Sequence, residues 1–163
     1  PAERGELGVM AAGPQCARPV AQSVFDAIGQ RTLWVADSGS QGTASRLKLT
    51  LNAYAFTVTH GLGEALALAK GLDVDPALFF EVVTGGPMDN PFLQAKGAAM
   101  RKDDYATSFT VTNAIKDSEL IVRAAQAANV RIDLAEAGLR RFQRAERIGH
   151  GDSDMAATHL AGF

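Results

Sequence analysis

Lys48 and Asn52 form the pair of residues in this sequence with the clearest chemical potential. Residues four apart in a helix lie on one face, with β-carbons about 6 Å apart. A lysine desolvated by an apolar pocket has a lowered pKa, so it can exchange a proton with a substrate hydroxyl. An amide one turn away can hold that hydroxyl, or a nearby carboxylate, in place. The spacing alone is weak, and a solvated lysine beside a polar neighbour is the simpler interpretation.

The pair lies in a long helix that the sequence predicts over residues 43–71. Gly39 and Gly42 precede it, and glycines there allow a sharp turn and the close approach of a ligand to the backbone. Gly61 and Gly63 would let another helix pack closely. Apolar residues recur at intervals of three and four and indicate an amphipathic stripe: Leu47, Leu51, Tyr54, Val58, Leu62 and Ala65.

Further helices are predicted over the rest of the chain, each opened by a capping residue. Segments 75–86 and 90–104 begin with Asp75 and Asn90, each followed by a proline suited to the first helical position. Segment 112–130 is predicted to begin at a Thr112 cap. Segments 133–149 and 152–163 open on Asp or Ser caps, and Asp152 and Asp154 are interpreted as capping residues.

The first 37 residues predict a different structure. Residues 7–13 and 31–37 favour strands, and residues 14–29 favour a helix between them, which makes one βαβ unit. One such unit cannot form a stable parallel sheet alone. Residues 1–37 are therefore interpreted as the remnant of a Rossmann-type domain whose beginning is absent. The predicted fold is mainly α, with a bundle of about six helices in residues 38–163.

Composition excludes several function classes. The formal net charge of -2 argues against nucleic acid or an anionic membrane surface as the main partner. No apolar run approaches the roughly 18 residues of a membrane span. The single cysteine, Cys16, excludes an internal disulfide and fits a reducing cytoplasm. His60, His150 and His159 lack the spacing of metal ligands, so no metal site is predicted.

The stretch "GSQGTASRLKLTLN" resembles the G-x-x-G-x-G-x-x-x-K-x-x-x-N signature of the β-hydroxyacid dehydrogenases. That family includes 3-hydroxyisobutyrate dehydrogenase and tartronate semialdehyde reductase, and 6-phosphogluconate dehydrogenase is a relative. Ala44 stands where the third glycine is usual, a mild departure if that residue is already helical. The blocks "LGVMAAG", "NPFLQAKGAAM" and "YATSFTVTNAIKDSELIVRAAQ" resemble further family segments in the same order. The resemblance covers essentially the whole chain.

The resemblance implies hydride transfer between NAD or NADP and a small 3-hydroxy acid or aldehyde-acid. Lys48 matches the general acid/base of the family, and Lys116 matches a lysine that reaches the cofactor, with Asp117 beside it. Substrate-binding roles are implied for four residues: Gly39, Gly42, Asn52 and Phe109. Structural alternatives stay open for three of these positions: a Lys116–Glu119 pair, a helix-supporting Asp117 and a Phe109 that only packs in the core.

The sequence contains no G-x-G-x-x-G, the turn that binds a dinucleotide pyrophosphate. We therefore expect these residues by themselves to bind NAD(P) poorly and to give no turnover. The small residues of the long helix predict a homodimer or homotetramer formed through it. A noncatalytic helical oligomerisation module is the alternative function, although Lys48 argues against it for the full protein.

Overall fold

A computed structural model describes residues 2–162 of the chain. It is mainly α-helical, as the sequence predicts, with two parallel strands near the beginning. The chain divides into two compact units, the first ending at Leu51 and the second beginning at Asn52. The domain boundary expected between residues 37 and 38 stays a prediction. Within residues 2–162, no helix is long and apolar enough to cross a membrane.

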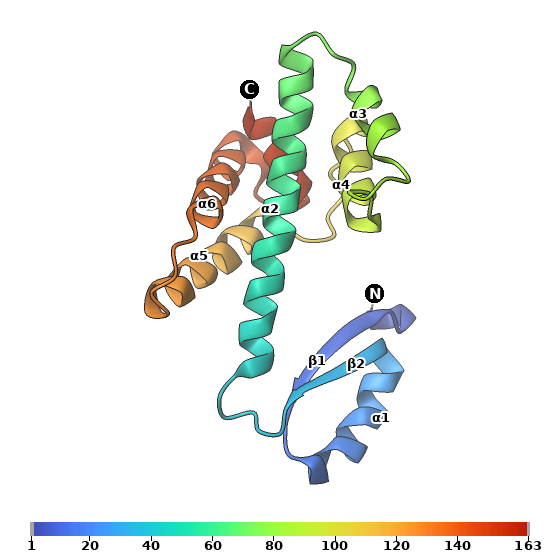
Figure 1. Cartoon of the computed structure of the whole chain (residues 1–163), viewed down its shortest axis with the longest axis vertical. Coiled ribbons are helices and arrows are strands. Elements are labelled where there is room, and N and C mark those ends of the chain that lie inside the picture. Colours follow the sequence, from blue (N-terminus) through green and yellow to red (C-terminus); the bar gives the residue numbers. More distant parts are fainter. Residues whose placement is uncertain (1, 163) are drawn as a thin grey trace. The chain divides into compact units, whose positions relative to one another are not determined.

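The first unit contains the predicted βαβ arrangement (Figure 1). Strand β1 (Leu7–Ala12) pairs in parallel with β2 (Gly29–Ala36), and α1 (Arg18–Ile28) connects them. Trp34 of β2 packs against α1. Its indole nitrogen donates to Gln22 at 2.9 Å, and its ring centroid lies 5.8 Å from that of Phe25. At Gly29 a β-carbon would meet the Leu7 carbonyl oxygen at 2.7 Å, so only glycine allows the helix to turn directly into β2.

Helix α2 (Thr43–Gly71) is continuous and runs through both units, which confirms the predicted long helix. The amphipathic stripe is only partly buried, because Tyr54 is 69% exposed and Leu51 is 47% exposed, whereas Leu62 is 4% exposed. In the second unit α2 is covered on two flanks, by α3 and α4 on one and by α5 and α6 on the other (Figure 1). Its buried residues therefore form two faces: Phe56, Thr59, His60, Leu62, Gly63 and Leu66.

Two helices begin at the predicted caps. Helix α3 (Pro76–Val83) starts after Asp75, whose carboxylate accepts the Ala77 N–H at 2.8 Å. Helix α4 (Pro91–Lys102) starts after Asn90, whose side-chain oxygen accepts the Leu93 N–H at 2.9 Å. In both cases proline fills the first helical position, where a missing N–H costs little.

Two other predicted caps are wrong. Helix α5 (Val111–Ala127) is capped by Thr110, whose hydroxyl accepts the Asn113 N–H, and Thr112 lies inside the helix. Val111, the first residue of the helix, is fully buried in the core. Helix α6 (Asp133–Ala145) follows Ile132 with no side-chain cap, and its aspartate lies in the first turn.

The chain ends in a π-helical and a 3-10 segment, where the sequence predicts α-helix. A π-helical turn (Glu146–His150) follows α6, and the last segment is a 3-10 helix (Met155–Gly162). Asp154 opens this 3-10 helix by accepting the Ala156 N–H at 2.9 Å, so its interpretation as a cap is confirmed. One core cluster joins this helix to α2, α3 and α4: Leu62, Leu66, Phe80, Val83, Leu93, Met100 and Ala156.

Substitution of two glycines can test how closely the helices of the second unit pack. A β-carbon at Gly97 in α4 would lie 2.3 Å from the Phe80 ring of α3, whereas one at Gly61 in α2 would meet nothing within 4 Å. We expect Gly97→Ala to lower the free energy of unfolding by about 1–3 kcal/mol through overpacking. Gly61→Ala should raise it by up to about 1 kcal/mol through helix propensity. Denaturant unfolding followed by circular dichroism measures both, and an unchanged or more stable Gly97→Ala protein would contradict the packing described.

Candidate functional site

The glycine turn before α2 adopts the geometry that its sequence predicts. Gly42 donates its N–H to the Gly39 carbonyl at 3.1 Å and has a φ of +64°, which L side chains rarely adopt. Its own carbonyl accepts the Arg46 N–H at 2.9 Å and so begins the hydrogen-bond ladder of α2. Ala44 is already helical, so the departure from glycine at this position leaves the turn intact. Lys48 follows one turn later with an exposed side chain.

In the second unit, Asn52 and Asp117 lie together. The Asn52 side-chain nitrogen donates to Oδ2 of Asp117 at 2.9 Å and links α2 to α5. The Lys116 ammonium lies 3.3 Å from Oδ1 of the same carboxylate. The structure therefore pairs Lys116 with Asp117 instead of Glu119, and it gives Asp117 a partner on another helix.

This contact fixes the chemistry that Asn52 can offer. An ionised carboxylate only accepts hydrogen bonds, so the amide must turn its NH₂ group toward Asp117. The amide oxygen then remains an acceptor for a hydroxyl. The Asp117 side chain is 15% exposed, whereas Lys116 is 64% exposed and presents its charge to solvent. The arrangement supplies a fixed polar amide, a shielded carboxylate and an accessible cation.

Phe109 is half-buried just before α5. Its ring lies 6.0 Å from the Phe56 ring on α2, and Phe56 in turn meets Phe142 of α6 edge-on at 5.3 Å. Core packing of Phe109 is therefore visible. Closure over a substrate pocket stays a prediction for this residue.

Sequence reasoning missed a buried charged pair in the second unit. Lys96 of α4 lies 2.7 Å from Asp154, and their side chains are only 10% and 4% exposed. Asp154 also accepts from the Ser108 hydroxyl at 2.6 Å. A single lysine on an amphipathic helix gives no local signal of burial. The partners are far apart in sequence, so only the fold could reveal them.

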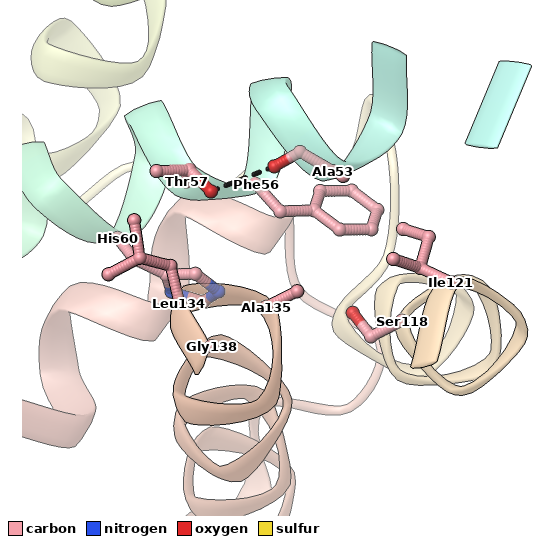
Figure 2. Close-up of a pocket in the computed structure, with 9 residues that line it drawn as sticks. All are labelled: Ala53, Phe56, Thr57, His60, Ser118, Ile121, Leu134, Ala135 and Gly138. Atoms are coloured by element: carbon pink, nitrogen blue, oxygen red, sulfur yellow. Dashed lines mark hydrogen bonds between the residues drawn. The ribbon is translucent and has the colours of Figure 1, made fainter. Parts of the chain in front are cut away.

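A small cavity of about 10 Å³ lies between α2, α5 and α6, with room for about one water molecule. Figure 2 shows its lining, with His60 of α2 facing Gly138 of α6. A β-carbon at Gly138 would lie 2.6 Å from the His60 ring, so glycine permits this close approach. Nδ1 of His60 is 3.0 Å from the Thr158 hydroxyl. Burial, helped by the charges of Arg141 and Arg144, lowers the pKa of His60 to about 3.

Each of the three histidines has a hydrogen-bond partner. His60 meets Thr158, His150 lies 3.2 Å from the Ser153 hydroxyl, and His159 lies 3.1 Å from the Gly63 carbonyl. In the part of the chain that the structure describes, no group of three or more His, Cys, Asp or Glu side chains could hold a metal ion.

A family model described as "NAD-binding of NADP-dependent 3-hydroxyisobutyrate dehydrogenase" matches residues 42–160. The chain belongs to this family. The resemblance to the β-hydroxyacid dehydrogenases is thereby confirmed. The family description names NAD and NADP, so the predicted cofactor class is confirmed at the level of the family.

Similar proteins agree with this family. Glyoxylate/succinic semialdehyde reductase 1 of Arabidopsis thaliana is 28% identical over 157 residues, which cover 96% of this chain and 53% of the relative. The chain thus spans about half the length of that reductase. The cytokine-like nuclear factor N-PAC of Anopheles gambiae is 26% identical over 159 residues, with 98% of this chain and 28% of the relative covered.

Among solved structures, 3-hydroxyisobutyrate dehydrogenase from Salmonella typhimurium has a TM-score of 0.88 and 26% identity, covering 98% of this chain and 55% of its own. The Mycobacterium tuberculosis 3-hydroxyisobutyrate dehydrogenase has a TM-score of 0.83 at 18% identity, covering 98% of this chain and 56% of its own, which shows the shared fold alone.

The buried histidine makes the stability of the second unit depend on pH. Because the His60 pKa is about 3 in the folded chain and 6.5 is its ordinary value, only the unfolded chain is protonated between these values. The contribution of neutral His60 to the free energy of unfolding is therefore complete above pH 6.5. It is lost as the pH falls, by about 1.4 kcal/mol per pH unit. His60→Asn keeps a polar atom near Thr158 and removes the titration.

Unfolding free energies of the original chain and of His60→Asn, measured from pH 7 to pH 4, should converge as the pH falls. The free energy of unfolding of the variant should depend less steeply on pH, because about one proton fewer is taken up on unfolding. Parallel curves would show that His60 does not titrate in this way.

Proposed function

We propose that this chain forms the helical catalytic part of an NAD(P)-dependent oxidoreductase that interconverts small 3-hydroxy acids and aldehyde-acids. The observation that carries the proposal is the Asn52–Asp117 hydrogen bond of 2.9 Å. It fixes a polar amide at the position that follows Lys48 by one turn of α2, where the family signature requires an asparagine. Family membership supports the reaction class.

Lys48 is the proposed general acid/base. Its ammonium gives a proton to the carbonyl oxygen when the aldehyde is reduced, and its neutral amine takes the hydroxyl proton when the alcohol is oxidised. The amide of Asn52 helps to position the substrate beside Lys48, while the proton of the reacting hydroxyl points to the Lys48 amine. The Gly39–Gly42 turn lets a small substrate approach the backbone without a side chain in the way.

The proposed cofactor contact is made by Lys116. Its ammonium is 64% exposed and is oriented by Asp117, so it suits the hydroxyl or phosphate oxygens of a dinucleotide. NAD(P) supplies the hydride when it is bound. This chain provides a cation beside the cofactor and the proton at Lys48.

The proposed substrates are small aldehyde-acids such as glyoxylate and succinic semialdehyde, which the name of the Arabidopsis relative contains. Because this chain covers 53% of that relative, the activity is proposed for an enzyme that also includes a dinucleotide-binding domain. The 163 residues alone are proposed to give no turnover. Assembly as a dimer or tetramer and a cytoplasmic location stay predictions.

A noncatalytic helical module is the second candidate function. The observation in its favour is that α2 exposes apolar side chains in both units, such as Leu51, Tyr54 and Leu68. Several similar proteins are also named as nuclear factors and not as reductases. A test of Lys48 separates the two candidates.

In the enzyme that contains this chain, Lys48→Met should lower kcat for the NADPH-dependent reduction of glyoxylate by about 10²–10⁴-fold, the usual contribution of a general acid/base. The control is Arg46→Met, which removes another exposed cation from the first turns of the same helix. Steady-state kinetics measures both variants, and circular dichroism verifies that each is folded. Full activity of the Lys48→Met enzyme would overturn the catalytic assignment and favour the noncatalytic module.

A further inference from the structure

The buried Lys96–Asp154 pair makes further hydrogen bonds, to Ser108 and Ala156. Burying an ion pair is costly unless further hydrogen bonds satisfy the remaining donors and acceptors. Oδ1 of Asp154 accepts from the Lys96 ammonium at 2.7 Å and from the Ala156 N–H at 2.9 Å. The same ammonium also reaches the Ser108 hydroxyl at 3.3 Å.

The second oxygen of Asp154 is used entirely on the segment before α5. Oδ2 accepts from the Ser108 hydroxyl at 2.6 Å, the Ser108 N–H at 3.1 Å and the Phe109 N–H at 3.2 Å. Burial by itself would raise the pKa of Asp154, but the hydrogen bonds from Lys96, Ser108 and Ala156 outweigh it and hold the pKa below its ordinary value. The group is therefore an ionised acceptor at neutral pH.

The backbone on either side of Asp154 holds the same segment. The Asp154 N–H donates to the Tyr105 carbonyl at 2.9 Å, and the Met155 N–H donates to the Phe109 carbonyl at 2.8 Å. Both polar backbone groups of Phe109 are thus fixed. The next residue, Thr110, caps α5, so the same contacts fix the start of the helix that carries Lys116 and Asp117.

We propose that the Lys96–Asp154 pair is a positioning element of the substrate site, which acts by holding Phe109 in place through Ser108. The inference rests on the function proposed above and on the substrate-binding role that the family resemblance implies for Phe109. Neither Lys96 nor Asp154 touches substrate or cofactor in this scheme. They fix the backbone from which the Phe109 ring projects toward Phe56 on α2.

The simpler interpretation is that Asp154 only caps the last 3-10 helix. A cap needs the Ala156 contact, whereas the Ser108 hydroxyl serves no part of that helix. Removing this hydroxyl therefore distinguishes the two roles. Asp154→Asn is the less useful variant, because it leaves the Lys96 ammonium buried without its counterion and endangers the fold.

The experiment uses the enzyme that contains this chain, with glyoxylate and NADPH. Ser108→Ala should raise KM for glyoxylate about 3–10-fold and leave kcat within about twofold, which corresponds to the net contribution of one ordinary hydrogen bond. Ser108→Thr restores the hydroxyl and should restore KM. Thr107→Ala is the matched control, because its neighbouring exposed hydroxyl donates to the Asp152 carbonyl and not to Asp154.

A rise in KM for Ser108→Ala alone supports the positioning role. Unchanged KM in Ser108→Ala, or an equal change in Thr107→Ala, overturns it and leaves Asp154 as a cap. Failure of the proposed function has a separate signature, full activity of the Lys48→Met enzyme. Loss of activity in that enzyme together with unchanged kinetics of Ser108→Ala would reject only the inference drawn here.

Discussion

The second unit depends on the burial of α2 along two flanks. Leu62 and Leu66 enter the core formed with α3 and α4, while Phe56 and His60 face α5 and α6. A helix buried on two sides cannot be assembled around a single apolar stripe, so small and polar residues occupy part of each face. Gly63 is one example, because the backbone of the last 3-10 helix lies 3.3 Å from where its β-carbon would be.

Several polar side chains enter this core with hydrogen-bond partners, although Nε of Arg141 is buried without one among the described residues. His60 meets the Thr158 hydroxyl, and Arg141 donates to the Thr158 carbonyl at 3.2 Å and to Glu64 at 2.9 Å. Burial lowers the pKa of Arg141, and the neighbouring Glu64 carboxylate opposes that effect. The Asp154 network follows the same rule, since buried polar groups without hydrogen bonds are strongly destabilising.

Local chemistry made much of the fold predictable. The Asp75 and Asn90 caps, each followed by proline, act over three residues and were correctly placed. The stripe through Leu51 and Tyr54 is only partly buried, because the burial of a helix depends on which neighbours cover it. Thr110 and Thr112 have the same side chain; Thr110 is the cap, and the buried Val111 is the first residue of the helix.

The candidate site also has parts that the sequence predicts and parts that only the packing of the helices reveals. Lys48, Asn52 and Gly42 belong to a spaced signature that is readable along the sequence, although their roles stay predictions. The contact between Asn52 and Asp117 joins residues on two helices, and Lys96 meets Asp154 across a similar gap in sequence. Such pairs carry no local pattern, because each partner is set by the packing of elements that are distant in the chain.

The placement of the aromatic chromophores has a spectroscopic consequence. Trp34 is the one tryptophan in the sequence, and it lies against Phe25 and Gln22 in the first unit. Tryptophan emission therefore reports on the strands and α1, while the helical signal in the far ultraviolet comes mainly from the second unit. If the two units unfold separately, the two signals will change at different denaturant concentrations. Comparing the two signals in one sample thus shows whether the two units unfold together or separately.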